Sequence, residues 1–162
     1  MKTITHLLLF SAMAILLMGC PYSSKVPVDT ANEKLDKNLF GKWVKDDNDE
    51  HPEYLVISEK EGNTYEIDKF SWENEEYKQE KQTMHLTTVG TTIFMNMQKE
   101  NDNNYYLHKM EIDGDKITVF VVTDNIDEKF SSSEDLKAFV TKYKDLSFFY
   151  NKDEETYIRG KE

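Results

Sequence analysis

The sequence predicts an all-β protein, mainly antiparallel, built as an up-and-down β-barrel of about eight strands with one C-terminal helix before the last strand. Short runs rich in β-branched and aromatic residues recur about every ten residues, and turn residues separate them. A helical pattern interrupts this series only once, so hairpins are expected to join most of the strands. Closure into a barrel would pair the two edge strands that an open meander would leave exposed.

The expected strands follow one another from residue 39 to the C-terminus. Asp113-Gly114 is the strongest hairpin signal, because both residues tolerate the positive φ of a type I′ turn. The charged stretch 73–81 is expected to be a connection. The expected strands are 39–44, 54–59, 64–72, 83–89, 91–97, 105–112, 117–123 and 155–159.

One amphipathic helix is expected after residue 130. Ser131 and Glu134 have the spacing of a capping box, which marks a helix N-terminus. Apolar residues then follow at the spacing of one helical face, namely Leu136, Phe139, Val140 and Tyr143. This face is expected to lie on the barrel, and docking of a partner is the alternative.

Residues 1–19 are typical of a bacterial export signal. Lys2 precedes an apolar run that is shorter than the roughly 20 residues of a membrane-spanning helix. The run ends in Leu-Met-Gly-Cys, which resembles the lipobox of bacterial lipoproteins, with the cysteine at Cys20. The resemblance implies cleavage before Cys20 and its acylation, with chains such as palmitate. The alternative is a buried N-terminal helix with an incidental cysteine.

The expected location is the cell envelope, where Cys20 anchors the protein in the lipid bilayer. Pro21 follows the cysteine, whereas the common signal for retention in the inner membrane is an aspartate. The outer membrane, with the protein facing the periplasm, is therefore the expected site.

Residues 20–38 are expected to form the lipidated cysteine and a flexible tether, and residues 39–162 the folded domain. The segment is polar, contains Pro21 and Pro27, and has no sustained apolar period. The alternative is an extension docked on the domain through Val26, Val28 and Leu35.

The chain has 162 residues with 20 basic and 31 acidic side chains, a formal charge of −11. Cleavage before Cys20 would leave 143 residues and remove one positive charge, giving −12. This length suits one domain. The acidic balance argues against nucleic acid as a partner, because phosphates attract Lys and Arg. A lone cysteine excludes an internal disulfide and a thiolate metal cage.

Two short features resemble lipocalins and their relatives in the calycin superfamily. Gly41-Lys42-Trp43 resembles the Gly-x-Trp element that opens these barrels, and Arg159 is the only arginine and lies in the expected last strand. In that superfamily the tryptophan closes one barrel end and an arginine packs across its ring. The resemblance implies this structural role for Gly41, Trp43 and Arg159, and a lipocalin-like barrel such as occurs in small bacterial lipoproteins. An open sheet or sandwich with Trp43 in its core is the alternative.

The sequence contains none of the familiar catalytic or phosphate-binding motifs. His85 and His108 each lie on an expected strand without a spaced partner, and the acidic loop 46–50 lacks the glycine that a calcium-binding EF-hand loop needs. The expectation is therefore a protein that is not an enzyme and has neither cofactor nor metal ion.

The expected function is a non-catalytic binding module, with a small apolar ligand as the candidate. Phe94, Tyr106 and Phe120 are candidates to line an apolar cavity, and a fully packed interior is the alternative. A function of another class is an acidic inhibitor or immunity-type lipoprotein that binds a basic protein partner, since opposite charge speeds encounter.

Overall fold

Residues 21–161, which the computed structural model describes, form β-strands, one α-helix and two short 3-10 helices. The strands are β1 (Ser23–Ser24), β2 (Gly41–Lys45), β3 (Tyr54–Lys60), β4 (Thr64–Glu73), β5 (Glu76–Val89), β6 (Thr92–Lys99), β7 (Tyr105–Asp113), β8 (Lys116–Val122) and β9 (Tyr150–Arg159). The helices are η2 (Lys37–Leu39), α2 (Ser133–Tyr143) and η3 (Ser147–Phe149).

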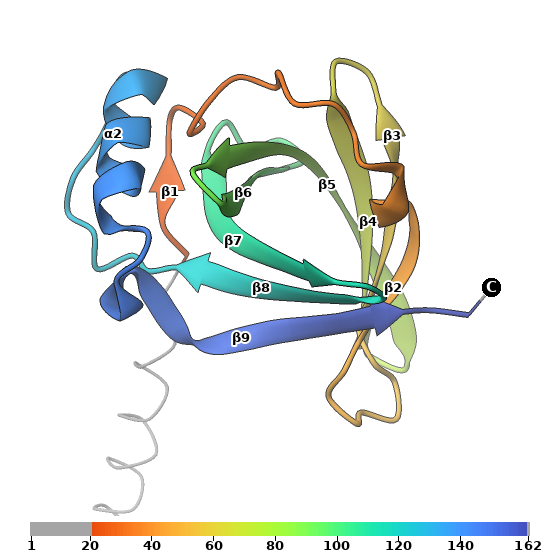
Figure 1. Ribbon diagram of the computed structural model, residues 1–162. Coiled ribbons are helices and arrows are strands. Elements are labelled where there is room, and N and C mark those ends of the chain that lie inside the picture. Colours follow the sequence, from red (N-terminus) through yellow and green to blue (C-terminus); the bar gives the residue numbers. More distant parts are fainter. Residues whose placement is uncertain (1–20, 162) are drawn as a thin grey trace, which may run out of the picture.

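Strands β2 to β9 close into an antiparallel barrel (Figure 1). Each strand pairs with the next one in the chain, and β9 returns to pair with β2, where Trp43 lies opposite Arg159. This pairing satisfies the backbone groups that two free edges would expose. The predicted fold class, an all-β up-and-down barrel with one helix before its last strand, is confirmed.

The charged stretch 73–81, which was expected to be a connection, instead contains a tight turn and the first half of β5. Asn74 and Glu75 both have positive φ, at 51° and 66°, and form the two-residue turn of a tight hairpin. The turn brings β4 and β5 into register from Glu73 opposite Glu76 onward. The last strand is likewise longer than expected and begins at Tyr150.

Helix α2 begins one residue later than the capping-box pattern indicates. The N-cap is Ser132, whose hydroxyl accepts a hydrogen bond from the backbone N–H of Asp135 at 3.2 Å. Leu136 and Val140 are buried, so the expected apolar face is the one that packs. The helix lies outside the barrel, beside β1 (Figure 1).

Two apolar clusters stabilise the domain. One fills the barrel interior and includes Trp43, Ile57, Tyr65, Ile67, Met84, Met95, Met110 and Ile117. The other lies between the outer barrel wall, α2 and the N-terminal segment, and includes Tyr22, Val28, Phe94, Leu107, Val122, Leu136, Val140 and Phe149. The strands next to α2 therefore bury apolar side chains on both faces.

The expectation of a flexible tether is wrong for residues 21–38, which are docked on the barrel. Ser23 and Ser24 of β1 pair with the first two residues of β7, beyond the point where β8 leaves that strand. Strand β1 therefore satisfies backbone groups of β7 that β8 does not reach. Val28 is fully buried, and Leu35 packs against the interior cluster.

Asn96 fastens this segment, and its replacement should be costly. Its side chain is 1% exposed, accepts from the backbone N–H of Val28 at 2.7 Å, and donates to the hydroxyl of Thr87 at 3.0 Å. Asn96→Ala leaves the buried backbone N–H of Val28 without its acceptor. We therefore expect a loss of about 2–3 kcal/mol in the free energy of unfolding. Urea denaturation checks this, with the partly exposed Gln98→Ala on the same face of β6 as control. Equal stability of the two variants would contradict the role of Asn96.

Candidate functional site

Trp43 and Arg159 lie together at one end of the barrel. The guanidinium carbon of Arg159 is 4.2 Å from the centroid of the Trp43 ring, and that ring is fully buried. The indole N–H donates to the carbonyl of Leu39 in η2 at 2.8 Å. Helix η2 thus closes this end of the barrel through the tryptophan.

Arg159 ties three segments to this end. Its guanidinium donates to the carbonyls of Phe40, at 3.2 Å, and Asn38, and to the carboxylate of Asp115 at 2.8 Å. A planar fork with several donors suits such a junction better than a lysine ammonium. Gly41 has a φ of +109°, and a Cβ built on it would lie 3.7 Å from an Arg159 guanidinium nitrogen. Glycine here allows the turn that brings the arginine across the ring.

An interior cavity of about 200 Å³ lies toward the opposite end of the barrel. Its apolar lining consists of Pro21, Leu55, Met95, Met97 and Val119. Its polar lining consists of the uncharged Gln82, Tyr106, His108 and Tyr157 and the charged Lys69, Glu80, Lys99 and Glu155. The apolar part of this surface suits a small, largely apolar ligand, and the polar groups around it can orient that ligand.

A hydrogen-bonded network of charges borders the cavity. Glu53 accepts from Lys69 at 2.7 Å and from the Tyr157 hydroxyl at 2.6 Å. Burial alone would raise the pKa of the Glu53 carboxyl, but these two hydrogen bonds and the positive charges of Lys69 and Lys45 together outweigh it and hold that pKa below its ordinary value. Burial, together with Glu155 and Glu53, raises the pKa of Tyr157, which therefore stays protonated. Glu53 is therefore anionic, and its carboxylate is paired with Lys69 and Tyr157.

His108 places a neutral imidazole in the cavity wall. Its Nδ1 lies 3.3 Å from the carbonyl oxygen of Tyr106, which can only accept, so Nδ1 carries the proton. Its Nε2 is then an acceptor on a ring that lines the cavity. Burial lowers the pKa of His108 to about 4, so the ring is uncharged at neutral pH. The wall therefore offers an acceptor to an uncharged ligand group such as a hydroxyl.

Of the three residues expected to line a cavity, the structure places Tyr106 in the wall and the other two outside. Phe94 is fully buried in the cluster under α2, and Phe120 lies with its ring 3.9 Å from the Lys109 ammonium on the outer face. The expectation for Phe94 and Phe120 is wrong because side chains alternate between the two faces along a strand. Two methionines also line the cavity: Met95 and Met97 flank the outward-facing Asn96, and this alternation along β6 marks them as inward.

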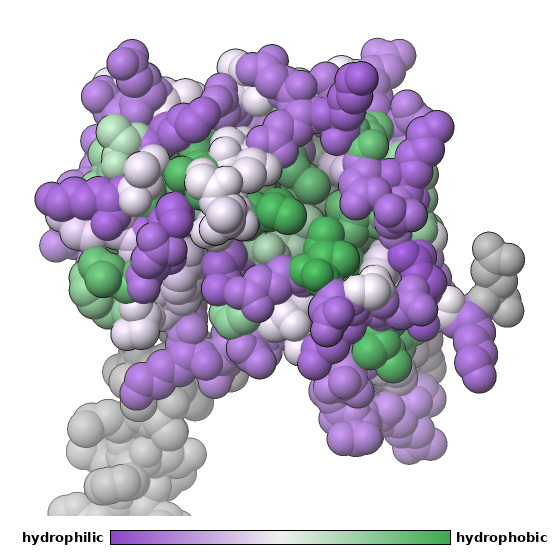
Figure 2. Space-filling view, viewed as in Figure 1, coloured by the Kyte–Doolittle hydropathy of each residue, from purple (hydrophilic) through white to green (hydrophobic). Residues whose placement is uncertain are grey.

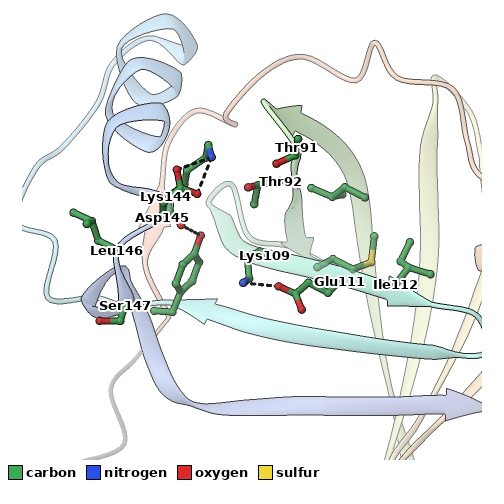
Figure 3. A pocket seen from close by; sticks show the side chains of 12 residues that line it. Thr91, Thr92, Lys109, Glu111, Ile112, Lys144, Asp145, Leu146 and Ser147 are labelled. Carbon is green, nitrogen blue, oxygen red and sulfur yellow. Dashed lines mark hydrogen bonds and ion pairs between the residues drawn. The ribbon is translucent and has the colours of Figure 1, made fainter.

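A larger, open groove of about 630 Å³ lies outside the barrel, between the end of α2 and the strands β6 and β7. Figure 3 shows Lys144 and Lys109 at this groove, each already joined to a neighbouring carboxylate, Asp145 and Glu111. Figure 2 shows apolar side chains gathered in the same region of a largely hydrophilic face. A ligand here would keep much of its surface in water, so the interior cavity is the better candidate.

Two kinds of feature are absent from residues 21–161, namely a cluster of metal-ligating side chains and a helix that could span a membrane. This part of the chain contains no group of three or more His, Cys, Asp or Glu side chains arranged to hold a metal ion. None of its helices is long and apolar enough to cross a membrane. Cys20 and the expected export signal, residues 1–19, lie outside the described residues.

Comparison with models of protein families finds no match. Comparisons with curated proteins and with solved structures find none either. The functional assignment therefore depends on the barrel and its cavity.

Proposed function

We propose that this chain is a lipid-anchored, non-catalytic binding protein of the cell envelope with a lipocalin-like barrel. The observation that carries the binding role is the interior cavity, whose wall combines apolar side chains with an acceptor on a neutral imidazole. Its ligand is small, uncharged and largely apolar, and carries one hydrogen-bond donor. The contact of Trp43 with Arg159 supports the lipocalin-like character of the barrel.

The anchor is an acylated Cys20, placed in the outer membrane and facing the periplasm. The apolar run that ends in Leu-Met-Gly-Cys supports this part of the proposal. Acyl chains joined to a protein stabilise membrane binding by burying methylene groups, and more than one chain gives a stable anchor. Cys20→Ala should move the protein from the membrane fraction to the soluble fraction and abolish incorporation of labelled palmitate. Unchanged fractionation and labelling would contradict the anchor.

The binding role is tested by filling the cavity. Met97→Trp places a larger side chain in the cavity wall, and Gln98→Trp places the same side chain on the opposite face of β6 as a matched control. The protein is purified gently from the envelope of its host and its intact mass is measured under native conditions. We expect a co-purifying small molecule on the wild type and on Gln98→Trp but not on Met97→Trp. A bare wild type, or a molecule that Met97→Trp retains, would contradict the cavity as the binding site.

A further inference from the structure

The first described residues of the chain lie at the rim of the barrel, beside the interior cavity. Pro21 is one of the residues that line the cavity, and it forms an isolated β-bridge with Thr123. Tyr22 is 3% exposed, and its carbonyl oxygen accepts from the backbone N–H of Leu107 at 3.3 Å. The chain is therefore held against the barrel up to the residue that follows Cys20.

This docking removes the spacer between an anchor at Cys20 and the domain. A flexible segment of about 18 residues would place the domain at a root-mean-square distance of about 25 Å from its anchor. Instead, a single peptide unit joins Cys20 to Pro21, and it spans about 3.8 Å between Cα atoms. Acyl chains attached to Cys20 would therefore begin at the rim of the cavity.

The charges at the cavity suit close approach to a lipid surface. The cavity is lined by two basic side chains, Lys69 and Lys99, and by two acidic ones, Glu80 and Glu155. These charges balance, whereas the chain from Cys20 onward carries a formal charge of −12. An anionic lipid surface repels a face with net negative charge. The lining of the cavity therefore adds no net negative charge that an anionic lipid surface would repel.

We propose that the interior cavity opens against the membrane that carries Cys20 and takes its ligand from that membrane. The occupant is a membrane amphiphile: its hydrocarbon part contacts Met95 and Met97, and an uncharged donor group meets Nε2 of His108. This inference rests on the proposed function, because it requires both the lipid at Cys20 and a cavity that binds.

The orientation is tested with fluorescent labels at the two ends of the barrel. Lys99→Cys introduces a thiol beside the cavity, and Asp113→Cys introduces one at the far end of β7. Asp113 lies seven residues beyond Tyr106 along this strand, roughly 23 Å at about 3.3 Å per residue. Each full-length lipidated variant is labelled, reconstituted in vesicles of envelope lipids from its host, and exposed to a lipid with a nitroxide on its headgroup.

We expect strong quenching of the label at position 99 and little quenching at position 113. A matched variant with about 18 glycine and serine residues inserted between Cys20 and Pro21 should lose the difference between the two labels. Equal quenching of the two labels without the insert, or stronger quenching at position 113, would overturn the orientation. A difference that survives the insert would also overturn the role of the docked segment.

The occupant is tested by photocrosslinking in the same vesicles. A diazirine analogue of methionine is incorporated throughout the chain, so that it occupies both the cavity wall, at Met95 and Met97, and the packed interior, at Met84. Irradiation should attach membrane lipid at positions 95 and 97 and not at position 84, which is 1% exposed. Absence of lipid adducts from the cavity positions would overturn uptake from the membrane. Absence of palmitate on Cys20 would instead overturn the proposed function, so the two failures are distinguishable.

Discussion

Replacement of Trp43 by alanine is expected to lower the free energy of unfolding by about 3–5 kcal/mol, the usual cost of removing a fully buried large aromatic side chain. The loss has two physical sources. The cavity left behind would separate η2 from the barrel, and the carbonyl of Leu39 would lose the indole donor. Trp43→Phe keeps the aromatic ring but not the donor, so it should cost less than Trp43→Ala.

Arg159 variants show how much of this stability comes from the guanidinium. Arg159→Ala loses the contact with the Trp43 ring and the hydrogen bonds to Phe40, Asn38 and Asp115, so we expect a cost of about 2 kcal/mol. Arg159→Lys should recover only part of it, because an ammonium cannot reproduce the planar fork.

Urea denaturation followed by circular dichroism measures these effects. Lys161→Ala, an exposed change two residues away, is the control and should leave stability unchanged within about 0.5 kcal/mol. Stability of Arg159→Ala equal to that of this control would contradict the closing role of the arginine.

Elements with a local chemical signal were predictable from the sequence. The predicted hairpin at Asp113-Gly114 is present, but its two turn residues are Gly114 and Asp115, and only Gly114 has a positive φ, at 58°. The helical face with Leu136 and Val140 was predictable because its period is independent of what the helix packs against. The barrel followed from the number and order of such elements.

Elements that depend on distant partners were not predictable in this way. The first half of β5 is exposed on both faces and has no apolar period, so its strand conformation comes from pairing with β4 and from contacts such as that between Lys81 and Asp68 at 3.2 Å. The docking of the N-terminal segment depends on Asn96, whose amide oxygen meets Val28 across 68 residues of sequence. No pattern within residues 21–38 reveals that acceptor.

The candidate site was only partly predictable for a related reason. Strands β6 and β8 have apolar groups on both faces, so their sequence alone does not show which face is interior. The outward face of β6 carries Phe94 because α2 and its neighbours cover that residue, so an apolar residue in β6 did not by itself mark the interior. The cavity itself depends on incomplete filling between residues of several strands, which periodicity does not report.

Acidification from pH 6.5 toward pH 4 is expected to destabilise the protein through His108. Burial is the largest cause of its low pKa of about 4. Among the charges that act on the ring, Glu155 raises this pKa and Lys69 lowers it, so the two oppose each other. In the unfolded chain the same histidine has its ordinary pKa of 6.5.

The sign of the effect follows from proton uptake. Between pH 6.5 and about 4 the unfolded chain binds a proton at His108 and the folded protein does not, so the free energy of unfolding falls as the pH falls. At about 1.4 kcal/mol for each pH unit, the full loss through this residue is roughly 3 kcal/mol. The contribution is complete above pH 6.5 and absent below about pH 4.

His85 and carboxyl groups also contribute to the pH dependence of stability, so the measurement compares matched variants. Burial also lowers the pKa of His85, and its contribution runs in the same direction. Urea denaturation of the wild type, His108→Gln and His85→Gln at pH 7.0, 6.0 and 5.0 stays above the ordinary pKa of the carboxyl groups. We expect His108→Gln to lose much of the pH dependence in this interval and His85→Gln to lose a separate part.

A pH dependence of His108→Gln identical to that of the wild type would show that the imidazole in the cavity wall is as accessible to protons in the folded protein as in the unfolded chain. The cavity would then offer its ligand a charged donor at mildly acidic pH instead of a neutral acceptor.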